Sequence, residues 1–162
     1  MEKKLDRLHG IAFLLGSLTH AAEKNMGKGS LSSCALAGKK FGEEAVEGTE
    51  TTDDPVRAVR LLSDALKKRG IVWDFEPFQG DQETMIEERD GARVIRLVFH
   101  TCMVRNALFR YAHEQKLSLC YMSHGVFAGA MEKIMPGKTC HLDILHAGPN
   151  ACLKELVIEE TK

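Results

Sequence analysis

The fold is decided by residues 117–158, LSLCYMSHGVFAGAMEKIMPGKTCHLDILHAGPNACLKELVI. This stretch opens with a helical pattern, predicted over residues 119–135, which Pro136-Gly137 ends. Two strands are predicted after it, over residues 138–146 and 152–159, on either side of Gly148-Pro149-Asn150. A helix followed by two antiparallel strands predicts a layer of helix packed on sheet.

The residues before this stretch add more helices and three more strands. Helical patterns are predicted over residues 3–26, 31–47, 55–68 and 103–116. Strands are predicted over residues 71–78, 84–88 and 93–99, and Asp90-Gly91 between the last two is typical of a hairpin turn. The fold class is therefore α+β, with N-terminal helices packed on an antiparallel sheet of about five strands.

Bulk composition excludes several classes of function. The 162 residues suit a single domain, residues 1–162, that buries a proper core. The net charge of −1 and the lack of a basic run argue against nucleic acid or an anionic membrane surface as partner. The apolar run over residues 11–18 is far shorter than the roughly 20 residues that span a bilayer. Five cysteines are an odd number, so we expect a cytoplasmic protein with reduced thiols.

Thiols and imidazoles gather in the last third of the chain. Four of the five cysteines and five of the seven histidines lie between residues 100 and 152. They are Cys102, Cys120, Cys140, Cys152, His100, His113, His124, His141 and His146. Because thiolate and imidazole suit zinc, iron–sulfur clusters and haem, this segment either builds a metal or thiol site or packs sulfur side chains into a core.

Three of these residues are distinguished by their predicted local structure. Cys120 and His124 lie four residues apart in a helix, so they share one face, as a metal-binding pair or as two core residues would. Cys102 follows a strand and begins a helix, where exposed amides and the helix dipole stabilise a thiolate. Cys102 is therefore a candidate metal ligand, a candidate nucleophile or a buried thiol at a strand end.

The strand predicted over residues 138–146 offers further donors. Alternation places Cys140, Leu142, Ile144 and His146 on one face, which we expect to point toward the core. Cys152 follows the tight turn after His146, so the turn can bring these two side chains close enough to share an ion. No pair has the CxxC spacing, and the metal hypothesis depends on several pairs converging.

The quoted stretch resembles the C-terminal signature of the 4-vinyl reductase (hydrocarbon-binding) domain. That signature has a cysteine, a Gly-x-x-x-Gly-x-x-Glu helix, a strand, and a glycine followed by a final cysteine. The matching positions are Cys120, Gly125, Gly129, Glu132, Gly148 and Cys152, within a resemblance that covers about residues 94–159. The family's strand often carries a carboxylate with a thiol three residues on, and here Asp143 and His146 occupy that spacing.

The resemblance implies an α/β fold with antiparallel strands that is usually dimeric. In sensor members such residues hold zinc beside a pocket for small aromatic or apolar ligands. The stretch is also similar to the C-terminal region of cluster-sensing repressors, whose three cysteines fall on Cys102, Cys120 and Cys152. A comparable cysteine layout occurs in the L-2-amino-thiazoline-4-carboxylic acid hydrolase-like family.

These observations give a defined hypothesis for the site. The predicted metal ligands are Cys102, Cys120 and Cys152, with His124 or His146 as the fourth. Zinc is the expected ion, and an iron–sulfur cluster or haem is the alternative. The ligand pocket is predicted to be lined by Phe99, Phe109, Tyr121 and Phe127.

Two functions compete at such a site, and the sequence leaves open whether the protein is an enzyme. In the first it is a ligand or redox sensor that does no chemistry. In the second it is a small hydrolase, with a metal-bound water or Cys102 as nucleophile.

The first helix predicts a partner chain. A single contact face of a helix does not easily bury Phe13 and Leu14 as well as the stripe of Leu8, Ile11 and Leu15. A second apolar surface usually marks an interface, so we expect a symmetric homodimer with this helix at its centre.

Overall fold

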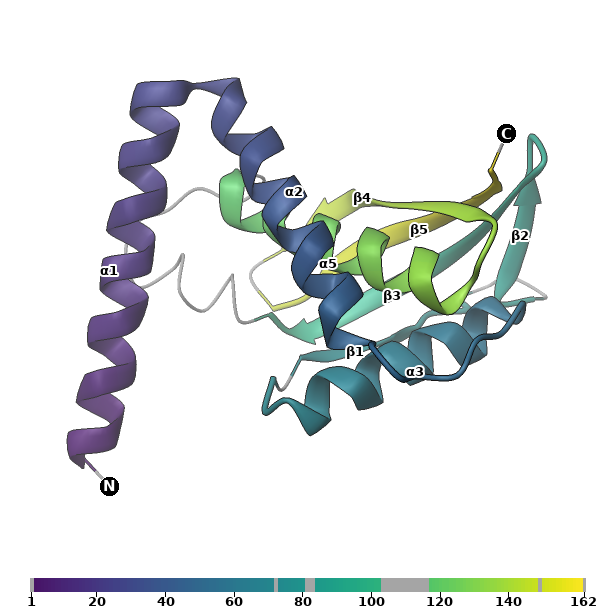
Figure 1. Cartoon of the computed structure of the whole chain (residues 1–162), viewed down its shortest axis with the longest axis horizontal. Coiled ribbons are helices and arrows are strands. Elements are labelled where there is room, and N and C mark those ends of the chain that lie inside the picture. The colour runs from purple at the N-terminus through teal and green to yellow at the C-terminus, as the bar shows by residue number, and fades with distance from the viewer. Residues whose placement is uncertain (1, 72, 81–83, 103–116, 149, 162) are drawn as a thin grey trace.

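The computed structural model describes residues 2–71, 73–80, 84–102, 117–148 and 150–161. Four helices are described there: α1 (Glu2–Met26), α2 (Lys28–Ala45), α3 (Pro55–Lys68) and α5 (Ser118–Ile134). The five strands are β1 (Asp74–Pro77), β2 (Ile86–Arg89), β3 (Ala92–Thr101), β4 (Lys138–Ala147) and β5 (Cys152–Glu160). The predicted α+β fold with a five-stranded antiparallel sheet is confirmed (Figure 1), and the helix predicted over residues 103–116 lies outside the described residues.

Short-range signals set two of the element boundaries. Asp54 caps α3, because its Oδ1 accepts hydrogen bonds from the backbone N–H groups of Val56 at 2.9 Å and Arg57 at 3.3 Å. In the β2–β3 hairpin, Asp90 and Gly91 adopt φ angles of 52° and 81°. Two successive positive φ angles are what a two-residue hairpin turn of type I′ requires. Both boundaries follow from residue types that the sequence displays.

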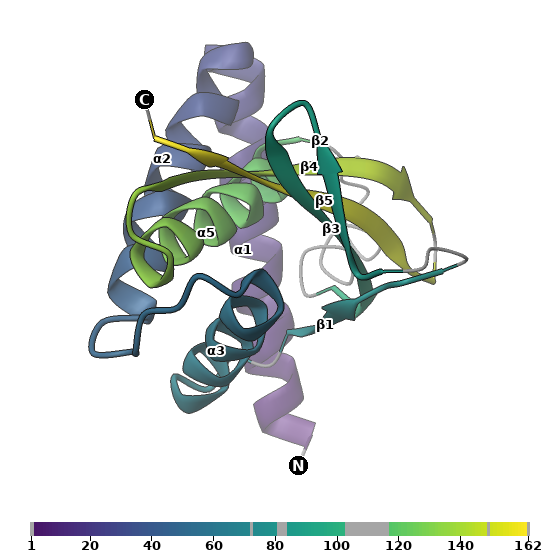
Figure 2. The ribbon, with the colours of Figure 1, turned by 90° about the vertical axis from the view of Figure 1, so that its right-hand side faces the viewer.

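The sheet has strand order β1-β3-β5-β4, and every pairing is antiparallel. β5 pairs with one edge of β3, while β1 and β2 pair with successive halves of its other edge (Figure 2). Alternate side chains of a strand share a face. On β5 the inward face carries Cys152, Lys154, Leu156 and Ile158, and all four are buried. One of these four core positions is therefore a lysine.

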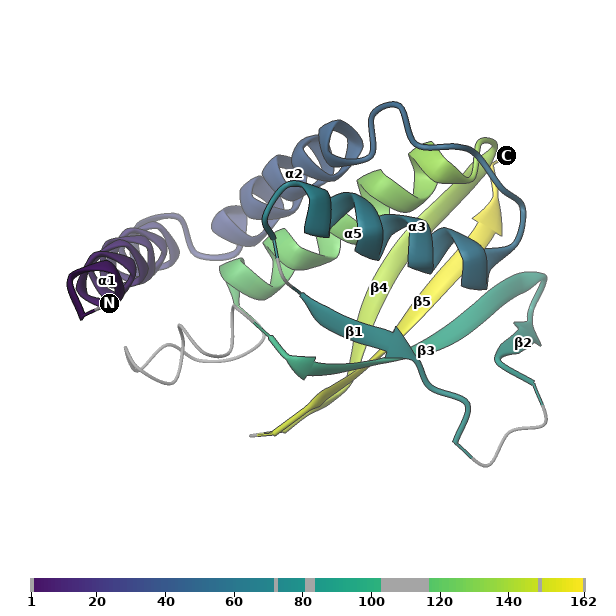
Figure 3. The same cartoon turned by 90° about the horizontal axis from the view of Figure 1, so that it is seen from below.

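Helices α2, α3 and α5 cover one face of the sheet (Figure 3). α5 packs on the sheet and α2 packs on α5 along a seam of Gly38, Gly42, Gly125 and Gly129. A Cβ atom on Gly125 would lie 2.0 Å from the carbonyl oxygen of Ala35, and one on Gly42 would lie 2.1 Å from that of Val126. Only glycine permits backbones to approach so closely. The Gly-x-x-x-Gly of the sequence is thus a helix-packing seam.

Helix α1 extends away from this two-layer body (Figure 1). It is joined near its C-terminal end, where Glu23 Oε1 accepts a hydrogen bond from the backbone N–H of Ser118 at 2.9 Å. Farther along the helix, Ile11 is 65%, Leu14 69% and Leu18 66% exposed. A single chain therefore leaves these apolar side chains of α1 uncovered. None of the described helices is long and apolar enough to cross a membrane.

Candidate functional site

Four aromatic side chains meet between α5 and the sheet. Phe75 of β1, Phe99 of β3, Phe127 of α5 and Trp73, which precedes β1, are all buried. The ring centroid of Phe127 lies 4.8 Å from that of Phe75 and 5.4 Å from that of Phe99, and Trp73 lies 5.9 Å from Phe99. The two predicted pocket residues Phe99 and Phe127 therefore belong to one aromatic cluster.

The aromatic cluster contains an unsatisfied polar group. The indole Nε1 of Trp73 is buried and has no hydrogen-bond partner among the described residues. A buried N–H without an acceptor costs about 1–3 kcal/mol of stability. The site therefore lacks one hydrogen-bond acceptor beside an otherwise apolar surface.

Lys154 lies over the Phe99 ring and is only 2% exposed. Its Nζ lies 3.3 Å from Ser123 Oγ on α5 and 4.8 Å from the centroid of the Phe99 ring. Burial lowers the pKa of this amine below its ordinary value. The alternation along β5 was the signal in the sequence that could have identified Lys154 as an inward-pointing cation.

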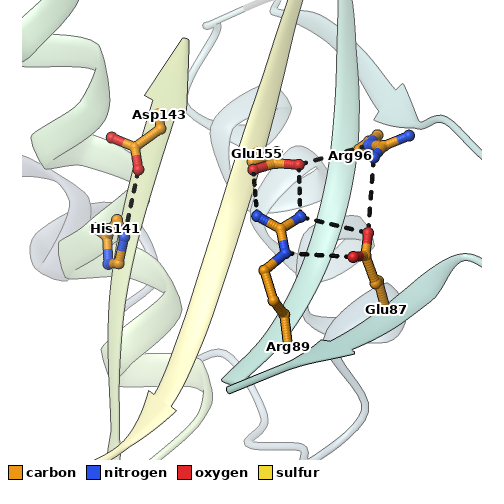
Figure 4. Close-up of polar contacts among 6 residues, drawn as sticks. All are labelled: Glu87, Arg89, Arg96, His141, Asp143 and Glu155. Atoms are coloured by element: carbon orange, nitrogen blue, oxygen red, sulfur yellow. Dashed lines mark hydrogen bonds and ion pairs between the residues drawn. The ribbon is translucent and has the colours of Figure 1, made fainter. Parts of the chain in front are cut away.

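The acidic neighbour of Lys154 in the sequence does not pair with it. Glu155 points to the opposite face of the sheet, where Arg89 binds its two carboxylate oxygens at 3.0 and 3.3 Å (Figure 4). Arg96 lies 3.5 Å from the same carboxylate, and the contacts of Arg89 with Glu155 and Glu87 raise the pKa of Arg89. Within the described part of the chain, no carboxylate forms an ion pair with Lys154.

Three of the predicted site cysteines lie within electrostatic range of Lys154. In order of strength, Cys120, Cys102 and Cys152 each interact electrostatically with its amine, and in the thiolate form each would raise its pKa. Cys102 directly follows β3, Cys152 begins β5 opposite Phe99, and Cys120 lies in the first turn of α5. Cys102 and Cys152 are buried and Cys120 is half-buried. The sequence did not anticipate the lysine with which these three cysteines interact, and their convergence on one ion stays a prediction.

After Ser123, His124 is the second polar residue of α5 near Lys154. Burial, and then the charge of Lys154, lowers the pKa of its imidazole to about 3, so the ring is neutral at physiological pH. Its Nε2 is buried and has no partner among the described residues, while its ring centroid lies 5.5 Å from that of Tyr121. Tyr121 itself, a predicted pocket residue, is exposed on the surface of α5.

The prediction that His146 points inward is wrong. The register of β4 against β5 shifts between Ile144 and His146, and such a bulge moves the following side chains to the other face. His146 is exposed and pairs with Leu153, and Asp143 is exposed beside His141 at 3.4 Å (Figure 4). Period-2 alternation failed here because one extra residue in β4 breaks it.

The contacts of Cys140 and Glu132 join elements of the fold to one another. Burial and the charge of Glu132 raise the pKa of the Cys140 thiol to about 12, so it stays protonated. Glu132 pairs with Lys39 of α2 at 2.6 Å and accepts a hydrogen bond from the Cys140 N–H at 3.3 Å. The glutamate of the predicted signature thus joins α5 to α2 and β4. Phe109, the remaining predicted pocket residue, lies outside the described residues.

Metal binding is not tested by this arrangement. The described residues contain no group of three histidine, cysteine or acidic side chains placed to hold one ion. Buried thiols are soft donors that suit zinc, but the same three thiols interact electrostatically with a lysine of the protein itself. Zinc at Cys102, Cys120 and Cys152 therefore stays a prediction.

Two surface hollows of about 550 and 400 Å³ lie beside α3, away from the cysteines. The first is lined largely by charged side chains, among them Glu50, Asp64, Lys68 and Arg69. The second reaches Phe75 but no other member of the aromatic cluster. Neither hollow includes Lys154 or His124.

Helices over one face of an antiparallel sheet, with a long helix at the N-terminal end, form a fold that a solved structure shares. That structure is the phenol-responsive sensory domain of the transcription activator PoxR, determined with phenol. The two chains align with a TM-score of 0.65 over 91% of this chain and 74% of the other, at 15% sequence identity. No protein-family model matches the sequence, and no curated protein matches it.

Proposed function

We propose that this chain is a sensory domain that binds a small aromatic or apolar molecule between α5 and the sheet. The observation that carries the proposal is the buried aromatic cluster with an unsatisfied Trp73 N–H. An apolar surface with a few polar groups that fix orientation is the usual composition of a small-molecule site. The shared fold with a phenol-responsive sensory domain supports the same conclusion.

The geometry favours binding over catalysis. Cys102 is buried, and His124 is neutral with no described contact to a nucleophile. A nucleophile needs a base within hydrogen-bond reach, and among the described residues no hydrogen bond joins Cys102 to a base. We therefore propose ligand sensing as the function and leave the hydrolase hypothesis without a supporting observation.

Titration calorimetry with phenol and toluene tests this proposal on the full chain. We expect saturable binding of at least one of them, with weaker binding of phenol to Trp73→Phe, which keeps an aromatic ring but removes the N–H. Phe78→Leu is the matched control because Phe78 is exposed. Absence of binding by every aromatic probe would contradict the proposal.

The proposal includes a homodimer formed through α1. Side chains such as Leu14 and Leu18 remain largely exposed on a helix of 25 residues. A helix of that length can supply much of the roughly 800 Å² per partner that a stable interface buries. We also propose a reducing compartment, the cytoplasm, because the five cysteines form no disulfide among the described residues and three of them are buried.

Zinc at the three thiols is a separate proposal. Cys102, Cys120 and Cys152 are the residues that would hold it, and the ion would contribute folding free energy there. Elemental analysis of protein prepared without oxygen, compared with Cys120→Ala, decides it. Stoichiometric zinc that the variant loses would support the proposal, and its absence from the wild type would refute it.

A further inference from the structure

We propose that Lys154 and His124 form a receiving site for a carboxylate or other oxygen anion on the bound aromatic molecule. The inference rests on the proposed function, because it assigns the chemical class of the ligand that would bind between α5 and the sheet. Neutral aromatic compounds would then be weaker ligands than aromatic monoanions. The two residues come from β5, which pairs with β3, and from α5, and β3 and α5 carry Phe99 and Phe127 of the aromatic cluster.

The hydrogen-bonding capacity of Lys154 is not filled by the described residues. An ammonium has three donors. One is used by Ser123 Oγ at 3.3 Å, and a second interaction is with the face of Phe99 at 4.8 Å. Ser123 donates its own proton to the carbonyl oxygen of Cys120 at 2.7 Å, so its oxygen is free to accept from the lysine. A third donor has no described acceptor.

These two contacts compensate the charge of Lys154 only in part. A cation–π contact and one hydrogen bond replace part of the hydration of a buried ammonium. Removing an ammonium from water stays costly unless an opposite charge pairs with it. Glu155 cannot contribute, because Arg89 and Arg96 hold its carboxylate on the opposite face. An anion brought by a ligand would supply the missing charge.

His124 provides a second donor for the same anion. Its Nε2 is buried without a described partner, and on α5 the residue directly follows Ser123, whose Oγ lies 3.3 Å from Lys154 Nζ. In the tautomer with the proton on Nε2, a neutral imidazole donates one hydrogen bond. Two donors from two elements match the two oxygens of a carboxylate. Phe99, which lies against both Lys154 and Trp73, supplies the surface for the aromatic ring.

The experiment compares benzoate with benzamide, which has nearly the same shape but no charge. Binding is measured by calorimetry and by the emission of Trp73, the only tryptophan. We expect wild-type protein to bind benzoate at least about tenfold more tightly than benzamide. Lys154→Met, which keeps the chain length without charge, should lose this preference and still bind benzamide. Lys133→Met, an exposed lysine of the same helix as His124, should behave as wild type.

Each outcome separates this inference from the proposed function. Benzamide or phenol binding without a preference for benzoate overturns the anion site and leaves the sensory domain intact. A preference that persists in Lys154→Met also overturns it. Stoichiometric zinc bound through thiolates around Lys154 would supply the counter-charge and abolish the preference in the wild type. If no aromatic probe binds folded protein, both proposals are wrong.

Discussion

The Nζ of Lys154 lies 4.8 Å from the centroid of the Phe99 ring, so a cation lies against the aromatic core of this protein. Lys154 is the only lysine or arginine among the described residues that is buried. A hydroxyl and an aromatic face contact its amine, three thiols interact with it electrostatically, and no carboxylate of the described residues pairs with it. The burial of this amine therefore affects the stability of the protein without ligand.

Replacing Lys154 by methionine should stabilise the ligand-free protein. Methionine keeps most of the volume and removes the cost of burying an ammonium, so we expect the free energy of unfolding to rise by roughly 1 kcal/mol or more. Urea unfolding at neutral pH measures the change, and Lys133→Met should leave it unaltered. A clear loss of stability in Lys154→Met would mean that the ammonium is fully compensated in the folded chain.

His124 should make the protein sensitive to acid. Its pKa is about 3 in the folded protein against an ordinary value of 6.5, so the unfolded chain binds the proton first as pH falls. The stabilising contribution is complete above about pH 6.5 and is lost between there and about pH 3, up to roughly 5 kcal/mol. Urea unfolding of wild type and His124→Gln across this range isolates the effect. Parallel pH profiles for the two proteins would contradict it.

The glycine seam between α2 and α5 should not accept a methyl group. In Gly125→Ala the new Cβ would lie 2.0 Å from the carbonyl oxygen of Ala35, so the helices must separate. We expect a loss of about 3 kcal/mol or more in unfolding free energy. Gly29→Ala is the control on α2, because its Cβ meets only Met26 at 4.0 Å and alanine favours helix by up to about 1 kcal/mol. Equal stability of both variants would show that the seam opens without cost.

The cysteines should differ in their rate of alkylation. Cys34 and Cys120 are partly exposed, whereas Cys102, Cys140 and Cys152 are buried. Cys140 should react last, because its thiol has a pKa of about 12 and lies in the core. Mass-spectrometric mapping of iodoacetamide labelling on native protein gives the order. Fastest labelling at Cys102 would instead support the hypothesis that it is a nucleophile.

The exposed apolar side chains of α1 should mediate dimerisation. Leu14→Glu puts a charge on this surface, and we expect it to shift the protein from dimer to monomer because a buried unpaired charge opposes association. Light scattering distinguishes the two states, since one chain has a mass of 18.0 kDa. Leu145→Glu, an equivalent change at an exposed site of β4, should leave the dimer intact. A wild-type mass of one chain would end this proposal.

Local signals in the sequence were sufficient for the elements of the fold. Asp54 before Pro55 fixed the start of α3, and Asp90-Gly91 fixed the hairpin, because capping and turn geometry depend on neighbouring residues alone. Hydrophobic periodicity identified α5 and the two strands after it for the same reason. It did not anticipate the bulge in β4, which arises from pairing with β5 and exposes His146.

The sequence by itself determined that Cys102 follows a strand, that Cys120 lies in a helix and that Cys152 begins a strand, since element boundaries follow from local patterns. Only the tertiary structure decided that a buried lysine lies within electrostatic range of these thiols. Glu155 follows Lys154 in the chain, yet the pleat of β5 sends the two charges to opposite faces, one to Arg89 and one to Phe99. Whether a buried charge finds a partner depends on contacts across strands and helices, and no local pattern contains those contacts.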